Sequence, residues 1–295
     1  MSLSQEQCFM NATLPYKQTE AEIANFLARI AVRALYFEVK AYPKPGLVSF
    51  VDSGAHQDMN GATFYRSILS LRHYFSQIIR EGLRRHDFAA LKQLAIQAEQ
   101  RMLEKTAGIN THRGAIFALG LLSISTARLM NAQSIFTARE LQQQLLADWR
   151  ADLAEHQTNP RSHGAVVRKN LKIVDARQMA MQGYELPFQL LAPFIELFLE
   201  TSSIDTVCLF AYLELLQGID DTNILYRKGE QGLAYAKSRA AELLALNCHQ
   251  ARMTQAIDMH HLFSRENISP GGVADLLAIV LFLGQVFCEQ LRCHY

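Results

Sequence analysis

The hydrophobic residues of this chain recur at intervals of three and four positions, the spacing of one face of an α-helix. The first such stretch follows a capping box formed by Thr19 and Glu22, three positions apart. It is predicted to end near Lys40, because Pro43 and Pro45 cannot continue a helix. The N-terminal part of the chain therefore predicts one amphipathic helix of about six turns.

Similar stretches predict helices along the rest of the chain. Their approximate ranges are 61–85, 87–105, 110–129, 137–154, 162–181, 186–199, 203–217, 230–247, 249–265 and a last helix from residue 270. No stretch shows the alternation of a half-buried strand bounded by hairpin turns. We therefore predict an all-α fold with less than about a tenth of its residues in strands, a single-domain bundle of roughly ten to twelve helices. The domain covers residues 19–295 and follows a flexible N-terminal arm, residues 1–18.

The composition is that of a globular protein with a large core. Of 295 residues, 49% are hydrophobic, and the formal net charge is +1, so the chain lacks the basic excess of a nucleic-acid-binding protein. None of the five cysteines forms a Cys-x-x-Cys pair, which argues against a zinc ribbon. The N-terminus has no signal-peptide pattern, and the most apolar segment, 276–286, is too short to span a bilayer. We expect a cytoplasmic protein with no nucleic-acid or membrane partner.

A polar cluster, residues 110–114, leads into an apolar helix. Asn110 or Thr111 can accept a hydrogen bond from the first free backbone N–H groups of that helix. The helix dipole favours an anion at the same place, and His112 and Arg113 suit one as well. These residues predict the floor of an anion-binding pocket; the alternative is an ordinary N-cap with one exposed arginine.

Further polar clusters stand in loops and at helix starts. They are residues 44–46, 56–58, 162–164, 220–223 and 269–275. Loops at the same end of a helical bundle lie close together in space. We therefore predict that these clusters and residues 110–114 line one polar cleft.

Adjacent acids and nearby cations suggest how that cleft binds a ligand. Asp220 and Asp221 repel each other, and a bound Mg²⁺ relieves such repulsion; the alternative is an N-cap aspartate with a solvated neighbour. The cations nearest the clusters are Lys44, Arg113, Arg227 and Lys228. They suit a polyphosphate, although most such residues are solvated surface charges. The chain has no P-loop, Rossmann glycine motif or His-Glu-x-x-His zinc motif.

In their order along the chain, these blocks resemble the triphosphoribosyl-dephospho-coenzyme A synthase family, which makes the prosthetic-group precursor of citrate lyase and malonate decarboxylase. The resemblance covers about residues 38–283. The matching blocks are Pro43-Lys44-Pro45-Gly46-Leu47-Val48, Ser53-Gly54-Ala55-His56-Gln57-Asp58-Met59, Asn110-Thr111-His112-Arg113-Gly114, Asp221-Thr222-Asn223 and Ser269-Pro270-Gly271-Gly272-Val273-Ala274-Asp275-Leu276-Leu277.

The resemblance implies a transferase whose substrates are ATP and 3′-dephospho-coenzyme A. The 2′-hydroxyl of the latter attacks the anomeric carbon of ATP, and adenine leaves. The implied catalytic residues are Glu38, Asp58 and Asp221, with Asp58 or Glu38 as the base. The implied cofactor is Mg²⁺, bound by Asp221 and Asp275. The implied nucleotide- and phosphate-binding residues are Lys44, His56, Asn110, Thr111, His112, Arg113, His163, Asn223, Arg227, Gly271 and Gly272.

One block departs from the family pattern. Where the family has a Gly-Glu pair and an Arg-Gly-Ala-Arg-Gly-Glu-Ala run, this chain has Gly164-Ala165 and residues 174–180, Val-Asp-Ala-Arg-Gln-Met-Ala. Because these residues are compatible with a helix, we predict an uninterrupted helix over 162–181. Because the charged residues of the family pattern are lost, we also predict that the transferase activity is weak. Three functions therefore stand side by side: the transferase, a nucleotide N-glycosyl hydrolase, and a catalytically weakened nucleotide-binding protein. Proteins of the acyl carrier pathway are the expected partners.

Overall fold

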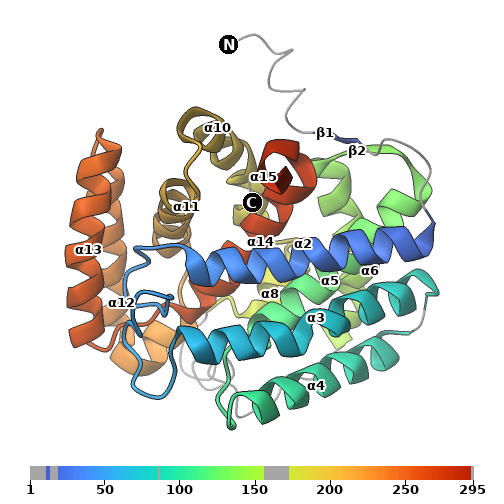
Figure 1. Cartoon of the computed structure of the whole chain (residues 1–295), viewed down its shortest axis with the longest axis horizontal. Coiled ribbons are helices and arrows are strands. Elements are labelled where there is room, and N and C mark those ends of the chain that lie inside the picture. The colour runs from blue at the N-terminus through green and yellow to red at the C-terminus, as the bar shows by residue number, and fades with distance from the viewer. Residues whose placement is uncertain (1–10, 14–18, 86, 156–172, 294–295) are drawn as a thin grey trace.

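The computed structural model describes residues 11–13, 19–85, 87–155 and 173–293. Within these ranges the fold is all-α, with thirteen helices and a two-stranded sheet (Figure 1). The strands are β1 (Asn11–Thr13) and β2 (Ile135–Thr137), which pair antiparallel with Ala12 opposite Phe136. The predicted fold class is confirmed, although residues 11–13 of the predicted arm form a strand.

The longer helices of the first half of the chain are α2 (Glu20–Lys40), α3 (Gly61–Leu83), α4 (Phe88–Lys105), α5 (Arg113–Ala132) and α6 (Ala138–Glu155). Those of the second half are α10 (Leu191–Thr201), α11 (Ile204–Gly218), α12 (Thr222–Leu244), α13 (His249–Arg265) and α14 (Gly271–Phe287). Three short helices, α8 (Ala176–Met181), α9 (Glu185–Gln189) and α15 (Glu289–Cys293), complete the set.

The core forms around α5 and α14, two apolar helices that are buried along most of their length. α5 packs against α2, α3, α4 and α6, and α14 packs against α2, α5, α10 and α11. By length and composition α5 would suffice to cross a membrane, but 78% of its most apolar stretch is buried inside the molecule. Its apolar character is therefore explained by the core it occupies.

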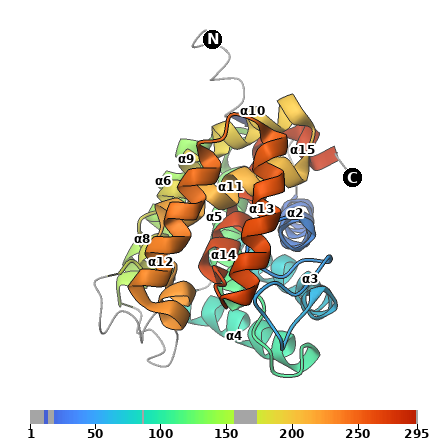
Figure 2. The same cartoon turned by 90° about the vertical axis from the view of Figure 1, so that its left-hand side faces the viewer.

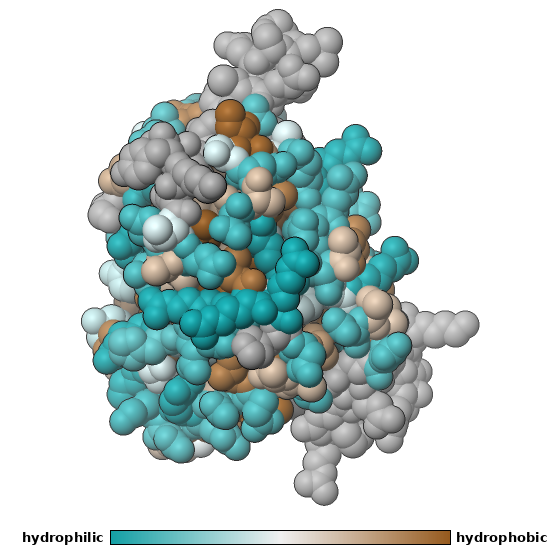
Figure 3. Space-filling model, turned by 90° about the vertical axis from the view of Figure 1, so that its right-hand side faces the viewer, coloured by the Kyte–Doolittle hydropathy of each residue, from teal (hydrophilic) through white to brown (hydrophobic). Residues whose placement is uncertain are grey.

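Two helix pairs cover this core. α2 and α3 run side by side on one face (Figure 1), while α12 and α13 stand together on another (Figure 2). The face of the molecule at the start of α2 and the end of α3 is largely polar, with small apolar patches between the hydrophilic side chains (Figure 3). The loop of residues 41–60, between α2 and α3, lies beside the connection between α13 and α14. At Gly46 its backbone comes so close to the Ile268 carbonyl that only glycine, which has no side chain, fits there.

The prediction of one uninterrupted helix over 162–181 is wrong for residues 173–175. Residues 173–175 are not helical, and α8 begins only at Ala176. Asp175 is the N-cap of α8, so the helix starts after it. Its carboxylate accepts the N–H of Gln178, while the Gln178 side chain accepts the N–H of Asp175. Residues 162–172, with His163, lie outside the described residues.

Two other helix limits differ from the prediction. The segment 186–199 forms the two helices α9 and α10, and α12 begins at Thr222 rather than near residue 230. α12 contains a kink at Gly229, whose φ is 66°. Only glycine adopts that conformation at little cost, so the pattern of apolar residues changes phase there.

Candidate functional site

A cavity of about 310 Å³ lies where the ends of several helices meet. The charged and polar residues that line it include Glu38, His56, Asp58, Asn110, Thr111, His112, Arg113, Asn223, Arg227, Ser269 and Asp275. We call this cavity the cleft. It joins residues of four of the five predicted clusters that the structure describes; residues 44–46 do not line it, although Leu47 and Val48 of the same loop do. Lys44, Asp221 and Gly272 are not among its lining residues.

The carboxylate of Glu38 is held in place by Lys44, which is fully buried. The Lys44 ammonium lies 2.9 Å from Glu38 Oε1 and 3.3 Å from the Val48 carbonyl, and it also donates to the Glu38 carbonyl. These three acceptors use all three N–H groups of the ammonium. Lys44 therefore acts through Glu38 and the loop rather than by direct contact with a ligand. Burial raises the pKa of Glu38, and the Lys44 charge opposes that shift.

A second group of contacts forms the wall of the cleft. His56 Nε2 lies 2.8 Å from Ser269 Oγ, and its Nδ1 lies 3.5 Å from Arg227 and 3.6 Å from Asp58. Arg227 is fixed further by the side chain of Asn267, at 2.7 Å. Burial and the Arg227 charge lower the pKa of His56, against the effect of Asp58. The wall thus combines a neutral imidazole with one fixed guanidinium.

The N-terminus of α5 forms the floor. Asn110 Oδ1 accepts the N–H of Arg113 (3.2 Å), as the capping prediction requires. Thr111 donates to Ser67 Oγ (2.7 Å), which in turn lies 2.6 Å from His112 Nδ1. His112 is 3% exposed, and burial together with the Lys44 charge lowers its pKa to about 3. Its other ring nitrogen, Nε2, is buried and has no hydrogen-bond partner.

Asp221 joins two helix N-termini. Its Oδ1 accepts the N–H groups of Asn223 (2.8 Å) and Ile224 (3.0 Å) at the start of α12, and its Oδ2 accepts Val273 N–H (2.9 Å) at the start of α14. Burial raises its pKa while these bonds oppose the rise. The neighbouring Asp220 binds Lys237 at 2.6 Å instead. The two acids are therefore compensated separately.

Asp275 is the carboxylate with the most perturbed surroundings. Burial, together with the charges of Glu38 and Asp221, raises its pKa to about 8. A Cβ atom on Gly114 would lie 1.9 Å from Asp275 Oδ2, so the backbone of α5 reaches the carboxylate only because residue 114 is glycine. No cluster of three or more His, Cys, Asp or Glu side chains suited to a metal exists among the described residues.

Comparison with known proteins identifies the family. The family model of ATP:dephospho-CoA triphosphoribosyl transferases (CitG) matches residues 24–292. The chain belongs to this family. Its transferase relatives include a probable 2-(5″-triphosphoribosyl)-3′-dephosphocoenzyme-A synthase of Acinetobacter calcoaceticus, 34% identical over 87% of this chain and 89% of the relative. A synthase of the same name from Escherichia fergusonii is 31% identical over 93% of this chain and 97% of the relative. No solved structure matches the chain.

Two residues beside the cleft, Ser67 and Tyr184, carried no signal in the sequence, and Ser269 stood out only as part of its block. Ser67 lies inside α3 and contacts His112, and Ser269 contacts His56. Tyr184 lies between α8 and α9 and lines a smaller cavity that shares Asp275 with the cleft. Isolated serines and tyrosines are too common for spacing alone to identify them as site residues.

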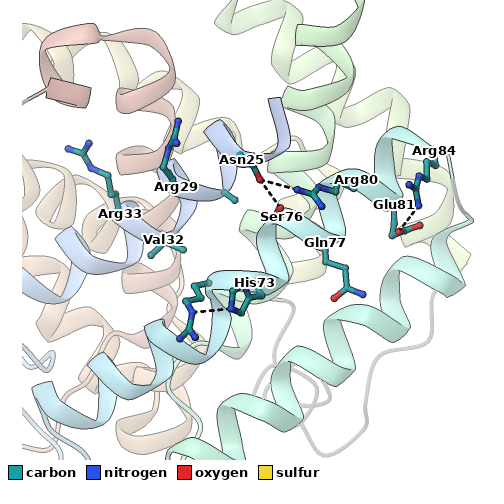
Figure 4. Close-up of a pocket in the computed structure, with 12 residues that line it drawn as sticks. Asn25, Arg29, Val32, Arg33, His73, Ser76, Gln77, Arg80, Glu81 and Arg84 are labelled. Carbon is teal, nitrogen blue, oxygen red and sulfur yellow. Dashed lines mark hydrogen bonds and ion pairs between the residues drawn. The ribbon is translucent and has the colours of Figure 1, made fainter. Parts of the chain in front are cut away.

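A larger hollow, of about 930 Å³, lies away from the transferase cleft, between α2 and α3 (Figure 4). Arginines line it, and some bind their neighbours: Arg80 donates to Asn25 (3.1 Å) and Arg84 to Glu81 (3.1 Å). It shares no lining residue with the cleft. The cleft contains the buried carboxylate of Glu38, whereas the carboxylate that lines this groove, Glu81, is bound to Arg84.

Proposed function

We propose that this chain joins ATP and 3′-dephospho-coenzyme A to give 2′-(5″-triphosphoribosyl)-3′-dephospho-coenzyme A, with release of adenine. In this reaction the acceptor 2′-oxygen forms a bond to the anomeric carbon of ATP as the bond from that carbon to adenine breaks. The observation that carries the proposal is the cleft itself, in which the buried carboxylate of Glu38 and the partly buried Asp275 lie beside Arg227 and the N-terminus of α5. Family membership supplies the substrate class.

The triphosphate fits the cationic side of the cleft. Arg227 is fixed by Asn267 and faces His56, and Arg113 stands at the rim, bound to Glu99 at 2.5 Å. The positive end of the α5 dipole adds an electrostatic preference for phosphate oxygens. In the proposal these groups hold the triphosphate, which stays on the transferred sugar.

Glu38 is the proposed base for the acceptor hydroxyl. Lys44 binds its Oε1, while Oε2 makes no hydrogen bond within the described part of the chain. Its raised pKa favours proton uptake, since a base works best when its pKa lies near the operating pH. Asp58, which is more exposed on the rim, is the second candidate.

His112 is the proposed hydrogen-bond donor to the leaving adenine. The Ser67 hydroxyl accepts from Thr111, and in the proposal it donates its own proton to His112 Nδ1. With Nδ1 as acceptor, the neutral ring carries its proton on Nε2. Nε2 is buried and has no partner within the described part of the chain. The low pKa keeps the ring neutral at physiological pH and so preserves this donor.

Mg²⁺ is the proposed cofactor, and the donor set fits it in part. Mg²⁺ usually binds one or two carboxylates together with substrate phosphates. Asp275 suits this role, because two further carboxylates raise its pKa and a cation would offset their charge. Asp221 fits less well, because three backbone N–H groups occupy its oxygens. When bound, the ion would neutralise part of the triphosphate charge.

We also propose the wider setting that the resemblance implies. The product would become the prosthetic group of an acyl carrier subunit, in citrate lyase or malonate decarboxylase, and the reaction would take place in the cytoplasm. The four described cysteines are free thiols, as in proteins of a reducing compartment.

The test is incubation with ATP, Mg²⁺ and 3′-dephospho-coenzyme A, followed by chromatography for adenine and the coupled product. The proposal expects both in equal amounts. Adenine without product would replace the transferase by an N-glycosyl hydrolase. If no adenine forms, the chain is a nucleotide-binding member of the family. The turnover number also measures what the altered 164–180 block costs in rate.

A further inference from the structure

Tyr184 has a buried hydroxyl that makes no hydrogen bond with any residue the structure describes. The residue as a whole is 2% exposed. A buried polar atom without a partner lowers stability, so natural proteins rarely keep one unless a ligand or a water binds it. The Tyr184 hydroxyl is therefore a candidate contact for something that binds to the protein.

The backbone holds this side chain in a costly conformation. Gly183 and Tyr184 both have positive φ angles, 71° and 48°. For a bulky residue such as tyrosine this region is strained. The Tyr184 N–H donates to the Met179 carbonyl (2.9 Å), which fixes the turn at the end of α8. Strain of this kind clusters at functional sites, which is a second sign that the position of Tyr184 matters.

Tyr184 lines two adjoining cavities. The smaller, of about 80 Å³, shares Gly114, Asn223 and Asp275 with the cleft. The larger, which we call the chamber, has a volume of about 330 Å³ and shares Tyr184 and Asp220 with the smaller one. The cleft, the smaller cavity and the chamber therefore lie next to one another, with Asp275 common to the first two and Tyr184 to the last two.

The described lining of this chamber is mixed. Val174, Met179, Ile219 and Leu276 contribute hydrocarbon surface, whereas Gln182, Glu185, Gln189 and Asp220 contribute polar groups. The two carboxylates would repel a phosphate, so such walls suit an uncharged group that also makes hydrogen bonds.

We propose that this chamber binds an uncharged, hydrogen-bonding part of the acceptor substrate, and that the Tyr184 hydroxyl hydrogen-bonds to it. The inference rests on the proposed function. The acceptor offers two groups of this chemistry, its adenine ring and its pantetheine arm. With either group in the chamber, the acceptor would pass Asp275 on its way to the cleft. Burial and the Asp275 charge raise the pKa of Tyr184, so the phenol stays neutral and keeps its proton for donation.

Tyr184→Phe separates a ligand contact from a packing role. The lost hydroxyl has no protein partner, so the ligand-free variant should melt at the wild-type temperature or above it. Its KM for 3′-dephospho-coenzyme A should rise about three- to tenfold, the value of one hydrogen bond, while its KM for ATP stays the same. Tyr74→Phe is the matched control, because the buried Tyr74 hydroxyl donates to the Ile116 carbonyl at 3.1 Å. The control should melt at a lower temperature and keep both KM values.

Gln182→Trp tests the chamber itself. Gln182 is exposed at the chamber and is not part of the core, so the larger side chain narrows the space without a loss of folding. We expect a raised KM for 3′-dephospho-coenzyme A, and no such change in Gln250→Trp, a control at an exposed position of α13. Pantetheine as a competitor identifies the group: weaker inhibition of Gln182→Trp assigns the chamber to the arm. Unchanged inhibition with a raised KM assigns it to the adenine ring.

Two results would overturn the inference while the proposed function stands. One is an active wild type whose Tyr184→Phe and Gln182→Trp variants keep its KM for 3′-dephospho-coenzyme A. The other is a selective rise in the KM for ATP, which would place the donor in the chamber. If the wild type forms no product, the proposed function fails. Calorimetry then tests whether the chamber binds 3′-dephospho-coenzyme A. If both variants bind this compound as tightly as the wild type does, the inference is rejected.

Discussion

At the scale of single residues, the cleft depends on full charges placed in the interior and compensated locally. Lys44 has no exposed surface, and Glu38 is its counter-ion. Removing one member of such a buried pair is costly, because the other is left as an isolated charge, whereas replacing both by uncharged groups is often tolerated. This asymmetry allows stability and catalysis to be separated at Glu38.

Glu38→Gln is expected to lower both stability and rate. The stability loss should be about 3–5 kcal/mol, because Lys44 loses its counter-ion. The double variant Glu38→Gln/Lys44→Met should regain most of the melting temperature in thermal denaturation. Its kcat should nevertheless stay about 10²- to 10⁴-fold below wild type, the usual contribution of a general base. Recovery of kcat together with stability would exclude Glu38 as the base.

Asp275 should make the stability of the ligand-free protein depend on pH. Its pKa in the folded state is raised to about 8, against about 3.9 in an unfolded chain. The folded state therefore binds more protons between these values, and this contribution to stability is lost as the pH rises through about 4 to 8. The Asp275→Asn variant has no carboxylate to ionise. As the pH rises through that range, the melting temperature of the wild type should therefore fall steadily relative to that of the variant. A constant difference from pH 5 to pH 8.5 would contradict the assignment.

At the scale of elements, the site is built where helix N-termini meet. α5, α12 and α14 all begin beside the cleft, with Asp221 joining the last two. Their N-terminal dipoles favour negative charge, which helps to explain how Asp221 and Asp275 are tolerated so close together. The same N-termini suit the phosphates of a substrate.

Asp221→Asn should destabilise the protein, although asparagine is as good an N-cap as aspartate. Asp221 must accept bonds on both oxygens, and the NH₂ group of asparagine would face either Val273 N–H or the N–H groups of α12. We expect a loss of about 1–3 kcal/mol in denaturant unfolding. Asp87→Asn is the matched control, because Asp87 caps α4 with one bond, from Ala90 N–H, and should stay within about 0.5 kcal/mol of wild type. Equal stability of the two variants would show that Asp221 is available for other roles, including metal binding.

At the scale of the whole molecule, the cleft ties together segments from nearly the entire chain. Glu38, Asp58, Arg113, Arg227 and Asp275 come from widely separated stretches and meet at one cavity. A ligand bound there contacts the folded state alone, so binding stabilises the whole fold, by about 2.7 kcal/mol at a concentration of 100 Kd.

Mg²⁺·ATP should therefore raise the melting temperature, and Arg227→Ala should reduce that rise. The reason is the loss of a guanidinium fixed at the cleft wall. Arg29→Ala, in the groove between α2 and α3, is the control and should keep the full rise, because Arg29 does not line the cleft. An equal reduction in both variants would mean that ATP binds in the groove or by overall charge.

Local sequence determined the helices and many of their ends. The capping box at Thr19 stands where predicted, and the helices predicted over 87–105 and 137–154 start at a cap on Asp87 and a capping box on Thr137, because a cap and its partner are three residues apart. The break at Asp175 was missed for a related reason. A helix-forming run and an N-cap aspartate compete locally, and the outcome depends on what each side packs against.

The sequence by itself also placed the polar clusters at helix starts, since such residues satisfy the free N–H groups there. Only the tertiary structure decided which of them face the cleft. Lys44 does not line it and pairs with Glu38, and Asp221 binds Val273, 52 positions away. The burial of the Tyr184 hydroxyl, which has no partner among the described residues, is likewise a result of tertiary packing. Burial and long-range pairing set the role of a charged or polar side chain, and neither is a property of its neighbours in sequence.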